Sequence, residues 1–187
     1  WGMTCLERFK GMFAFALYDK EKEKLFLVRD RVGVKPLYLY HDGEHFIFGS
    51  ELKSFHQNPA FKKEIDFDAL ALYLKLSYIP TPYCIFKNTQ KLKPGHFIEI
   101  NLAKKSFSEK KYWDVVDAYN APKLDISYAE AVDELEGILR ESFMYRMVAD
   151  VPVGVFLSGG YDSAAVAAGP SLCRPCRRRV AVYSSRS

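Results

Sequence analysis

One segment, residues 150–168, restricts the fold of this chain more than any other. It opens with the valine-rich run Asp150–Leu157, a composition typical of a strand that is covered on both faces in a parallel sheet. The run leads into Ser158-Gly159-Gly160-Tyr161-Asp162-Ser163 and then into the small residues Ala164–Ala168. This order predicts a strand, a glycine loop and the start of a helix.

The residues of the loop favour phosphate binding. The first turn of a helix leaves backbone N–H groups unpaired and carries partial positive charge. Glycines let the backbone approach a polyphosphate closely, and the hydroxyls of Ser158 and Ser163 add donors. Asp162 would cap the helix or reach a metal ion that accompanies the nucleotide. A plain turn followed by a plain cap is the alternative, and a Walker A loop is excluded because no Lys follows the last Gly.

The first hundred residues read mostly as strands. The predicted strands are Met12–Asp19, Leu25–Arg29, Leu37–His41, His45–Gly49 and His96–Ile100. Asp42-Gly43, between two aromatic-rich runs, predicts a hairpin with a type I′ turn. Antiparallel strands accompanied by helices indicate layered sheets with the helices outside.

Three further helices are predicted. Glu51–His56 is short, and Glu51 would stabilise its N-terminus. Asp66–Ser77 has apolar residues at helical spacing (Phe67, Leu70, Ala71, Leu74) and Asp66 as its N-cap. Ser127–Met147 begins with a capping box of Ser127 and Glu130. Its apolar face comprises Tyr128, Ala131, Leu135, Ile138, Leu139 and Met147.

A change to polar and aromatic character near Ser106–Pro122 predicts a boundary between a domain at 1–113 and a second at 114–187. Within the second, Gly169-Pro170 is expected to end the helix after little more than one turn. Residues 169–187 show neither helical nor strand period. We therefore interpret them as an anomalous tail, arising from a reading-frame shift or an assembly artefact.

Composition and charge favour a cytosolic enzyme. The chain is 49% hydrophobic and 27% charged, without a membrane-spanning run or a signal peptide. Five of the 27 Lys and Arg residues follow Ala168, where no acid occurs, and the remaining 22 are balanced by 23 Asp and Glu. The basic pI therefore does not indicate a nucleic-acid partner.

No metal site is predicted. Cys173-x-x-Cys176 lacks a second pair of ligands, and His41, His45, His56 and His96 have no metal-like spacing. Cys5 and Cys84 are expected to be buried free thiols. The adjacent charges of Arg29-Asp30 are interpreted as a solvated or locally bonded pair rather than an active pair.

Two sets of motifs resemble one family. Leu157–Ser163 (LSGGYDS) resembles the PP-loop of the N-type ATP pyrophosphatases, and Asp150–Ser163 as a whole resembles the start of the synthetase domain of glutamine-hydrolysing asparagine synthetases. Arg8–Asp19, Arg29–Tyr38 and Gly49–Lys53 are similar to the later half of a class II glutamine amidotransferase domain. These blocks follow one another in the family order.

The resemblance implies an α+β fold of the N-terminal-nucleophile type, with stacked antiparallel sheets of which only the C-terminal part is present. The first strand, loop and helix of an α/β PP-loop domain follow it. It implies that glutamine is hydrolysed to ammonia, that aspartate is activated with ATP and Mg2+ as β-aspartyl-AMP, and that ammonia displaces AMP. The implied ATP-binding residues are Leu157, Ser158, Gly159, Gly160, Asp162 and Ser163. A homodimer is one assembly that the resemblance allows.

The sequence departs from the family where the glutaminase nucleophile is concerned. The family uses a Cys at the mature N-terminus, whose α-amino group is the base, whereas Cys5 is internal and its nitrogen is an amide. We therefore assign no catalytic residue. Met12 is either a core residue or the family's Met beside the ammonia passage. Two alternatives stay open: a related amidotransferase of polysaccharide or β-lactam biosynthesis, and a catalytically silent remnant.

Overall fold

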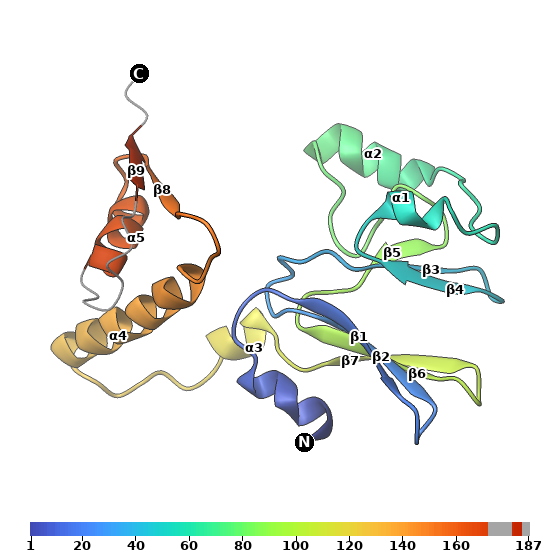
Figure 1. The fold of residues 1–187 in the computed structure, drawn as a ribbon, viewed down its shortest axis with the longest axis horizontal. Helices are drawn as coiled ribbons and strands as arrows, with labels where there is room; N and C mark the ends of the chain where they lie inside the picture. Colours follow the sequence, from blue (N-terminus) through green and yellow to red (C-terminus); the bar gives the residue numbers. More distant parts are fainter. Residues whose placement is uncertain (172–180, 185–187) are drawn as a thin grey trace. The chain divides into compact units, whose positions relative to one another are not determined.

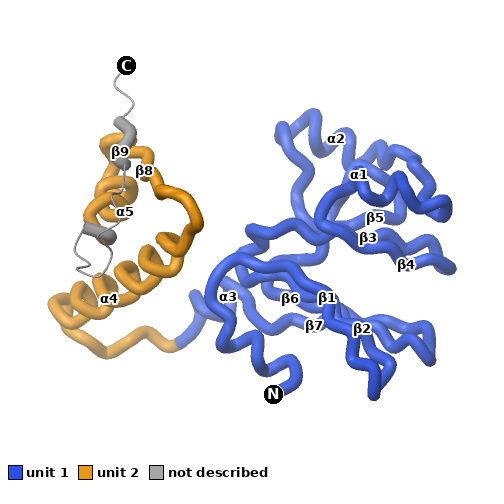
Figure 2. The backbone as a smooth tube through the Cα atoms, viewed as in Figure 1, with its two compact units in different colours: residues 1–121 blue, residues 122–187 orange. Residues whose placement is uncertain are grey.

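The computed structural model of the chain describes residues 1–171 and 181–184. The chain forms two compact units, unit 1 at residues 1–121 and unit 2 at residues 122–187 (Figure 2). Unit 1 continues past residue 113, the end of the first predicted domain, because the short helix α3 (Val115–Tyr119) belongs to it. An ion pair between Lys111 and Asp117 ties this helix to the preceding strand.

Unit 1 contains two antiparallel sheets (Figure 1). The first sheet has the order β1-β2-β6-β7, formed by Ala14–Asp19, Lys24–Arg29, His96–Asn101 and Ser106–Lys111. The second sheet has the order β4-β3-β5, formed by Phe46–Gly49, Tyr38–His41 and Thr89–Lys91. The predicted strands are confirmed, whereas β5 and β7 had no clear signal in the sequence.

Successive residues of β2 show how the layers are held together. Leu27 belongs to a buried cluster with Leu39 of β3 and Ile98 of β6, so this cluster lies between the two sheets. Phe26 and Val28 point to the other face, as the two-residue period of a strand requires. There they pack with Leu6 of the 3-10 helix η1 (Gly2–Arg8). The first sheet is therefore covered by the second sheet on one face and by η1 on the other.

The second sheet is covered by helices on its outer face (Figure 1). Tyr40 of β3 points away from Leu39 and meets the Phe61 ring edge-on, with the ring centroids 5.0 Å apart. Phe55, the last residue of α1 (Leu52–Phe55), packs on the same ring at 5.6 Å. Helix α2 (Phe67–Leu76) lies on this side too and contributes the buried Ala69. The prediction of layered antiparallel sheets with helices outside is thus confirmed.

The β3–β4 hairpin is confirmed, but its predicted turn type is wrong. His41 pairs with Phe46, so the loop has four residues, 42–45, instead of the two that a type I′ turn has. Only Gly43 has a positive φ, of 100°. The Asp42 carboxylate holds the loop by accepting hydrogen bonds from the backbone N–H groups of Glu44 and His45, at 3.1 and 2.7 Å.

Helix α2 begins as predicted, directly after its N-cap residue Asp66. The Asp66 carboxylate accepts hydrogen bonds from the N–H groups of Asp68 and Ala69, both at 3.0 Å. The apolar residues whose spacing predicted the helix do not all face the core, because Phe67 is 72% exposed and Leu74 is 75% exposed. The helical spacing of the apolar residues therefore predicted the helix correctly. The residue that α2 buries, however, is Ala69.

The described part of unit 2 contains α4 (Tyr128–Arg146), β8 (Gly154–Leu157), α5 (Tyr161–Ser171) and β9 (Ala181–Ser184). The predicted capping box of α4 is confirmed. Ser127 N–H donates to the Glu130 carboxylate at 2.8 Å, and Glu130 N–H donates to the Ser127 hydroxyl at 3.3 Å. Strands β8 and β9 pair in parallel. No helix in the described part of the chain is both long and apolar enough to cross a membrane.

Two expectations about the C-terminal part are wrong. Helix α5 continues through Gly169 and Pro170 to Ser171, and β9 follows where neither helix nor strand was expected. Proline disrupts a helix mainly from its interior, and Pro170 lies next to the last residue. Gly169 packs where a Cβ atom would lie 2.3 Å from a ring carbon of Phe143 in α4. Cys173, Cys176 and the five C-terminal Arg residues lie outside the described residues.

Candidate functional site

The loop Ser158–Ser163 connects the end of β8 to the first turn of α5. Gly159 has a φ of 84°, a conformation that side chains with a Cβ atom rarely adopt. No atom lies within 4 Å of the place that a Cβ atom of Gly159 would occupy. The turn thus needs glycine for its backbone conformation, and it leaves open space beside the backbone.

The two serines of the loop lie together across the turn. Their hydroxyl oxygens are 3.1 Å apart, and the Ser158 N–H donates to the Ser163 hydroxyl at 3.3 Å. The Ser163 hydroxyl in turn donates to the carbonyl oxygen of Gly160 at 3.0 Å. Hydroxyl protons rotate freely, so both side chains can turn a donor toward an anion placed over the loop.

Asp162 is the second residue of α5, and its side chain is exposed. Because the helix starts at Tyr161, the cap position falls on Gly160, and Asp162 is not the N-cap residue. A carboxylate in the first turn of a helix is favoured by the helix dipole but repels a phosphate. Of the two roles expected for Asp162, the cap is therefore wrong, and a contact with a metal ion stays a prediction.

The loop stands at the carboxyl ends of two parallel strands. Leu157, the last residue of β8, is half-buried and is aligned with Ser184 at the end of β9. Ligands of open α/β sheets bind at this edge, outside the carboxyl ends of the strands. The sequence order strand, loop and helix therefore places this loop at the edge of the two strands where ligands of such sheets bind.

A cavity of about 500 Å³ extends from the loop between α4, β8 and α5. Ser163 contributes to its wall together with apolar side chains, among them Phe143, Met147, Val155 and Val166. Sequence reasoning missed this cavity because the motif at residues 150–163 forms only part of its wall, and the rest comes from α4 and α5. A mostly apolar lining with a few polar groups, here Ser142, Arg146 and Ser163, is typical of small-molecule pockets.

Arg29-Asp30 forms a buried hub of hydrogen bonds in unit 1. Asp30 is completely buried, and its two carboxylate oxygens accept from the N–H groups of Val34 and Lys35, each at 2.9 Å. The Arg29 guanidinium donates to the carbonyl oxygens of Gly33, Lys35 and Leu92. Desolvation lowers the pKa of Arg29. The locally bonded interpretation of this pair is confirmed, and the solvated one is wrong.

Tyr112 and Gly95 extend the hub. The Tyr112 hydroxyl donates to the Arg29 carbonyl oxygen at 2.7 Å, and burial raises the pKa of Tyr112 to about 12, so this donor stays protonated. Gly95 donates its N–H to the Asp30 carbonyl oxygen at 3.0 Å. Its φ is 65°, and a Cβ atom there would lie 2.2 Å from the carbonyl oxygen of Trp113. The hub is structural and exposes no group for catalysis.

The remaining candidate residues are dispersed. Met12 is 46% exposed, so the core reading of Met12 is wrong. Glu51 forms an ion pair with Lys53 at 2.7 Å and makes no side-chain cap. Cys84 is a buried free thiol as expected, and burial raises its pKa, while Cys5 is only half-buried against the cluster around Leu6. In the described ranges no three His, Cys, Asp or Glu side chains gather to hold a metal ion.

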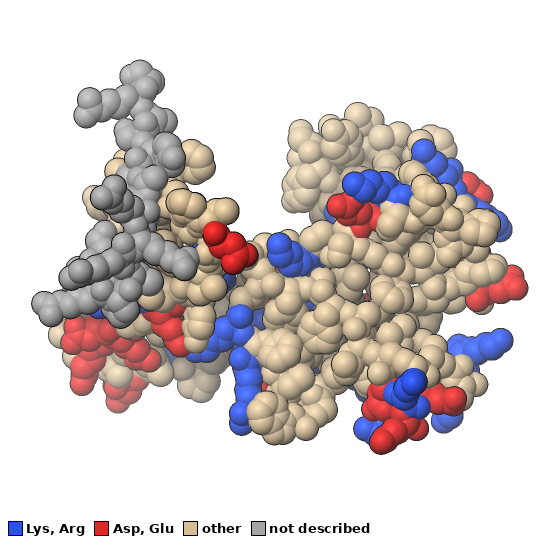
Figure 3. Space-filling model, viewed as in Figure 1, with Lys and Arg blue, Asp and Glu red and all other residues tan. Residues whose placement is uncertain are grey.

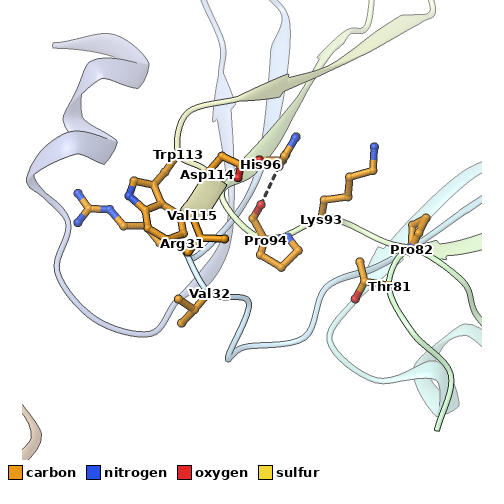
Figure 4. Close-up of a pocket in the computed structure, with 10 residues that line it drawn as sticks. All are labelled: Arg31, Val32, Thr81, Pro82, Lys93, Pro94, His96, Trp113, Asp114 and Val115. Atoms are coloured by element: carbon orange, nitrogen blue, oxygen red, sulfur yellow. Dashed lines mark hydrogen bonds between the residues drawn. The ribbon is translucent and has the colours of Figure 1, made fainter. Parts of the chain in front are cut away.

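A second cavity, of about 510 Å³, lies within unit 1 (Figure 4). Trp113, Pro94 and Val115 give it an apolar wall, and the charged groups around it are already engaged. Lys93 pairs with Glu109 at 3.4 Å. A ring nitrogen of His96 lies 2.7 Å from the carbonyl oxygen of Pro94. This cavity contains none of the predicted site residues and brings no nucleophile beside a base.

Arg31 also borders this cavity. Figure 4 shows its side chain running beside Trp113, with the guanidinium turned toward η1. One guanidinium nitrogen donates to the carbonyl oxygen of Glu7 at 2.9 Å. Its Nε is buried without a hydrogen-bond partner in the part of the chain that the structure describes. The Arg31 guanidinium thus binds η1 and is not directed at a ligand.

The fold and the loop define a class of protein. Residues 1–113 match the family described as glutamine amidotransferase domain, and since this is more than half of the chain, the chain belongs to that family. Residues 134–186 match the family described as asparagine synthase, a range that includes β8, the loop and β9. The order of the two matches is the one that the sequence motifs predicted.

Individual relatives carry both regions. The chain is 42% identical over 170 residues to a putative glutamine-hydrolyzing asparagine synthetase 2 of Methanocaldococcus jannaschii, an alignment that covers 88% of this chain and 32% of the relative. It is 34% identical over 169 residues to the glutamine-hydrolyzing asparagine synthetase 3 of Bacillus subtilis, covering 90% of this chain and 26% of the relative. The chain thus spans about a third of the length of these relatives or less.

Proposed function

We propose that this chain is part of a glutamine-hydrolysing asparagine synthetase and that unit 2 contributes the loop that binds the polyphosphate of ATP. The observation that carries the proposal is the loop itself. Gly159 turns the backbone with a positive φ, and the hydroxyl of Ser158 lies 3.1 Å from that of Ser163, which is in the first turn of α5. The match of residues 134–186 to the asparagine synthase family supports it.

Each loop residue has a proposed role. The N–H groups of Gly159 and Gly160 and the hydroxyls of Ser158 and Ser163 donate to the β- and γ-phosphate oxygens. Leu157 ends the strand beneath the adenosine, and the apolar cavity beside Ser163 receives the base. These donors stabilise negative charge on the pyrophosphate as it leaves, which is the electrostatic contribution that such a reaction needs.

Magnesium fits the donor set at this loop. Asp162 supplies an exposed carboxylate, the ligand type that Mg2+ prefers, in the turn that carries the phosphate donors. When bound with ATP, the ion would neutralise phosphate charge. Asp162 would then hold the metal and leave the phosphate oxygens to the N–H and hydroxyl donors, which removes the conflict of an acid at an anion site.

In the proposed reaction, a carboxylate oxygen of aspartate attacks the α-phosphorus of ATP, and the bond to pyrophosphate breaks. Ammonia from glutamine then displaces AMP to give asparagine. Unit 1 belongs to the glutamine amidotransferase family and is the part to which glutamine hydrolysis is proposed to belong. A homodimer, cytoplasmic location and the substrates aspartate, glutamine and ATP are all parts of this proposal.

Titration calorimetry with ATP in the presence of Mg2+ tests the role of the loop. The Ser163→Ala variant is expected to bind ATP about tenfold more weakly, because it loses one hydrogen bond to a charged oxygen. The Gly159→Ala variant should also weaken binding, since its φ of 84° is strained for alanine.

The matched control is Gly137→Ala. Gly137 lies in α4 with nothing within 4 Å of its Cβ position, so binding should be unchanged. Inorganic pyrophosphate should compete with ATP. Equal affinities in the Gly159→Ala and Gly137→Ala variants, or no competition by pyrophosphate, would contradict the proposed loop contacts.

A second candidate is another amidotransferase of the same build. It is favoured by a 32% identity over 167 residues to a protein named amidase chry2 of Gibberella zeae, which covers 89% of this chain and 24% of the relative. Measuring ATP–pyrophosphate exchange with aspartate and with other carboxylic acids separates the two candidates. A silent remnant would support neither this exchange nor glutamine hydrolysis.

A further inference from the structure

Phe143 of α4 stands between two cavities of unit 2. The first, which we call the loop cavity, is the one of about 500 Å³ that extends from the loop between α4, β8 and α5. The second, which we call the rear cavity, measures about 290 Å³ and lies between α4 and α5. Among the described residues, Phe143 is the only one that lines both cavities. Its side chain is therefore the partition between them.

The neighbouring helix α5 holds the ring of Phe143 in this place. Gly169 of α5 packs on the ring so closely that a Cβ atom at this position would lie 2.3, 3.0 and 3.3 Å from three of the ring carbons. The space between the two helices is thus filled by the ring, because residue 169 has no side chain. A ring packed in this way cannot turn aside unless the helices move apart.

The rear cavity is apolar, although acidic side chains gather on the surface over α4 (Figure 3). Two charged residues border this cavity, Glu136 and Arg140, and they form an ion pair with each other at 2.5 Å. The apolar lining comprises Val132, Leu135, Leu139, Phe143, Ala165 and Ala168. Because the two charges are paired, the rear cavity is suited to an apolar group.

We infer that Phe143 limits the size of the base that the loop cavity accepts. This role rests on the proposed function, in which the phosphates bind at the loop and the base enters the loop cavity. Gly169 follows Ser163 by six residues in α5, so the ring meets this helix about 9 Å along its axis from the phosphate end. The amino group at C6 is the part of adenine furthest from the ribose and the phosphates. A substituent on this amino group therefore points toward Phe143 and the rear cavity.

A benzyl group on this amino group distinguishes the protein with the ring from a variant without it. In the wild type, unsubstituted adenine fits in front of Phe143, whereas the benzyl group collides with the ring. Replacing Phe143 by Ala removes a phenyl ring and joins the two cavities, and the phenyl ring of the benzyl group is of the same size and fills the vacated place. Rejection by a collision in one form, and acceptance by a matching space in the other, is discrimination by shape.

Titration calorimetry on the whole chain, with ATP and with N6-benzyl-ATP in the presence of Mg2+, tests this role. The wild type should bind ATP about tenfold more tightly than N6-benzyl-ATP. The Phe143→Ala variant should reverse this preference and bind N6-benzyl-ATP about tenfold more tightly than the wild type does. The Phe143→Leu variant keeps an apolar contact between α4 and α5 and should show a smaller gain in the same direction. Circular dichroism checks that each variant keeps the helices of unit 2.

The matched control is Leu139→Ala. Leu139 lies one turn before Phe143 in α4 and borders the rear cavity but not the loop cavity, so its truncation leaves the ring in place and should leave the preference for ATP unchanged.

Three results would overturn the role of Phe143 and leave the proposed function intact. They are equal binding of ATP and N6-benzyl-ATP by the wild type, no gain for N6-benzyl-ATP in either Phe143 variant, and a gain in Leu139→Ala as large as that in Phe143→Ala. A wild-type chain that binds neither nucleotide would instead overturn the proposed function, and the role of Phe143 with it.

Discussion

At the scale of single residues, the buried Asp30 is the most consequential group in unit 1. It binds two consecutive N–H groups of the same loop and lies against an arginine that is bound to three carbonyl oxygens. A buried charge is tolerated only where such partners compensate for lost hydration. The sequence showed an acidic residue next to a basic one, but it did not show that both side chains would be buried.

We expect Asp30→Ala to lower the free energy of unfolding of unit 1 by about 3 kcal/mol. The change leaves the N–H groups of Val34 and Lys35 without their acceptor, and it removes the negative charge beside the buried Arg29 guanidinium. Urea denaturation followed by tryptophan fluorescence measures it, because both tryptophans lie in unit 1.

The matched control is Asp19→Ala. Asp19 also accepts two backbone N–H groups, those of Glu21 and Lys22, but in an exposed turn where water replaces the lost acceptor. Its expected cost is about 1 kcal/mol or less. Equal losses in the two variants would show that the burial of Asp30 has no energetic consequence.

At the scale of elements, the sequence predicted what is encoded locally and missed what depends on distant partners. The strands from β1 to β4, helix α2 and the capping box of α4 carry their own period or cap. Strand β7, with the sequence SFSEKK, is exposed along its whole length and exists because β6 pairs with it. The extension of α5 depends on Gly169 meeting Phe143, a contact that no local pattern contains.

The same distinction applies to the candidate site. The glycine loop between a strand and a helix could be predicted, since all its residues are consecutive. The apolar cavity beside it could not, because its walls come from three separate elements. That the loop binds ATP stays a prediction, as does the assignment of each donor.

The capping box of α4 offers a test at this scale. Replacing Ser127 by Ala should destabilise α4 by about 1 kcal/mol, since it leaves the N–H of Glu130 without its acceptor. Circular dichroism at 222 nm during thermal unfolding measures this loss. A double-mutant cycle with Glu130→Ala should give a coupling energy different from zero, and strict additivity would contradict the reciprocal bonding.

At the scale of the whole molecule, the buried core is unevenly divided. Most of the buried apolar residues belong to unit 1, whereas within the described part of unit 2 only Met147 and Val155 are buried, each at 9% exposure. Several large side chains of α4, including Leu135 and Ile138, are more than half exposed. The free energy of unfolding rises with the buried apolar area, so we expect unit 2 to be less stable than unit 1.

We therefore expect two separate unfolding transitions. Unit 2 should lose its helix signal at a lower urea concentration than the one at which the tryptophan fluorescence of unit 1 changes. Recording both signals in one titration is sufficient. Coincident midpoints for the two probes would mean that the units unfold as one cooperative body.

The hub around Asp30 also limits how this protein can vary in length. Asp30 binds the amides at positions 34 and 35, while Arg29 binds the carbonyls at 33, 35 and 92. Inserting or deleting one residue between 30 and 35 would carry these groups out of reach of both side chains. Natural or engineered length changes should therefore be tolerated at exposed turns such as 20–23 and 102–105, and rejected in the loop after β2.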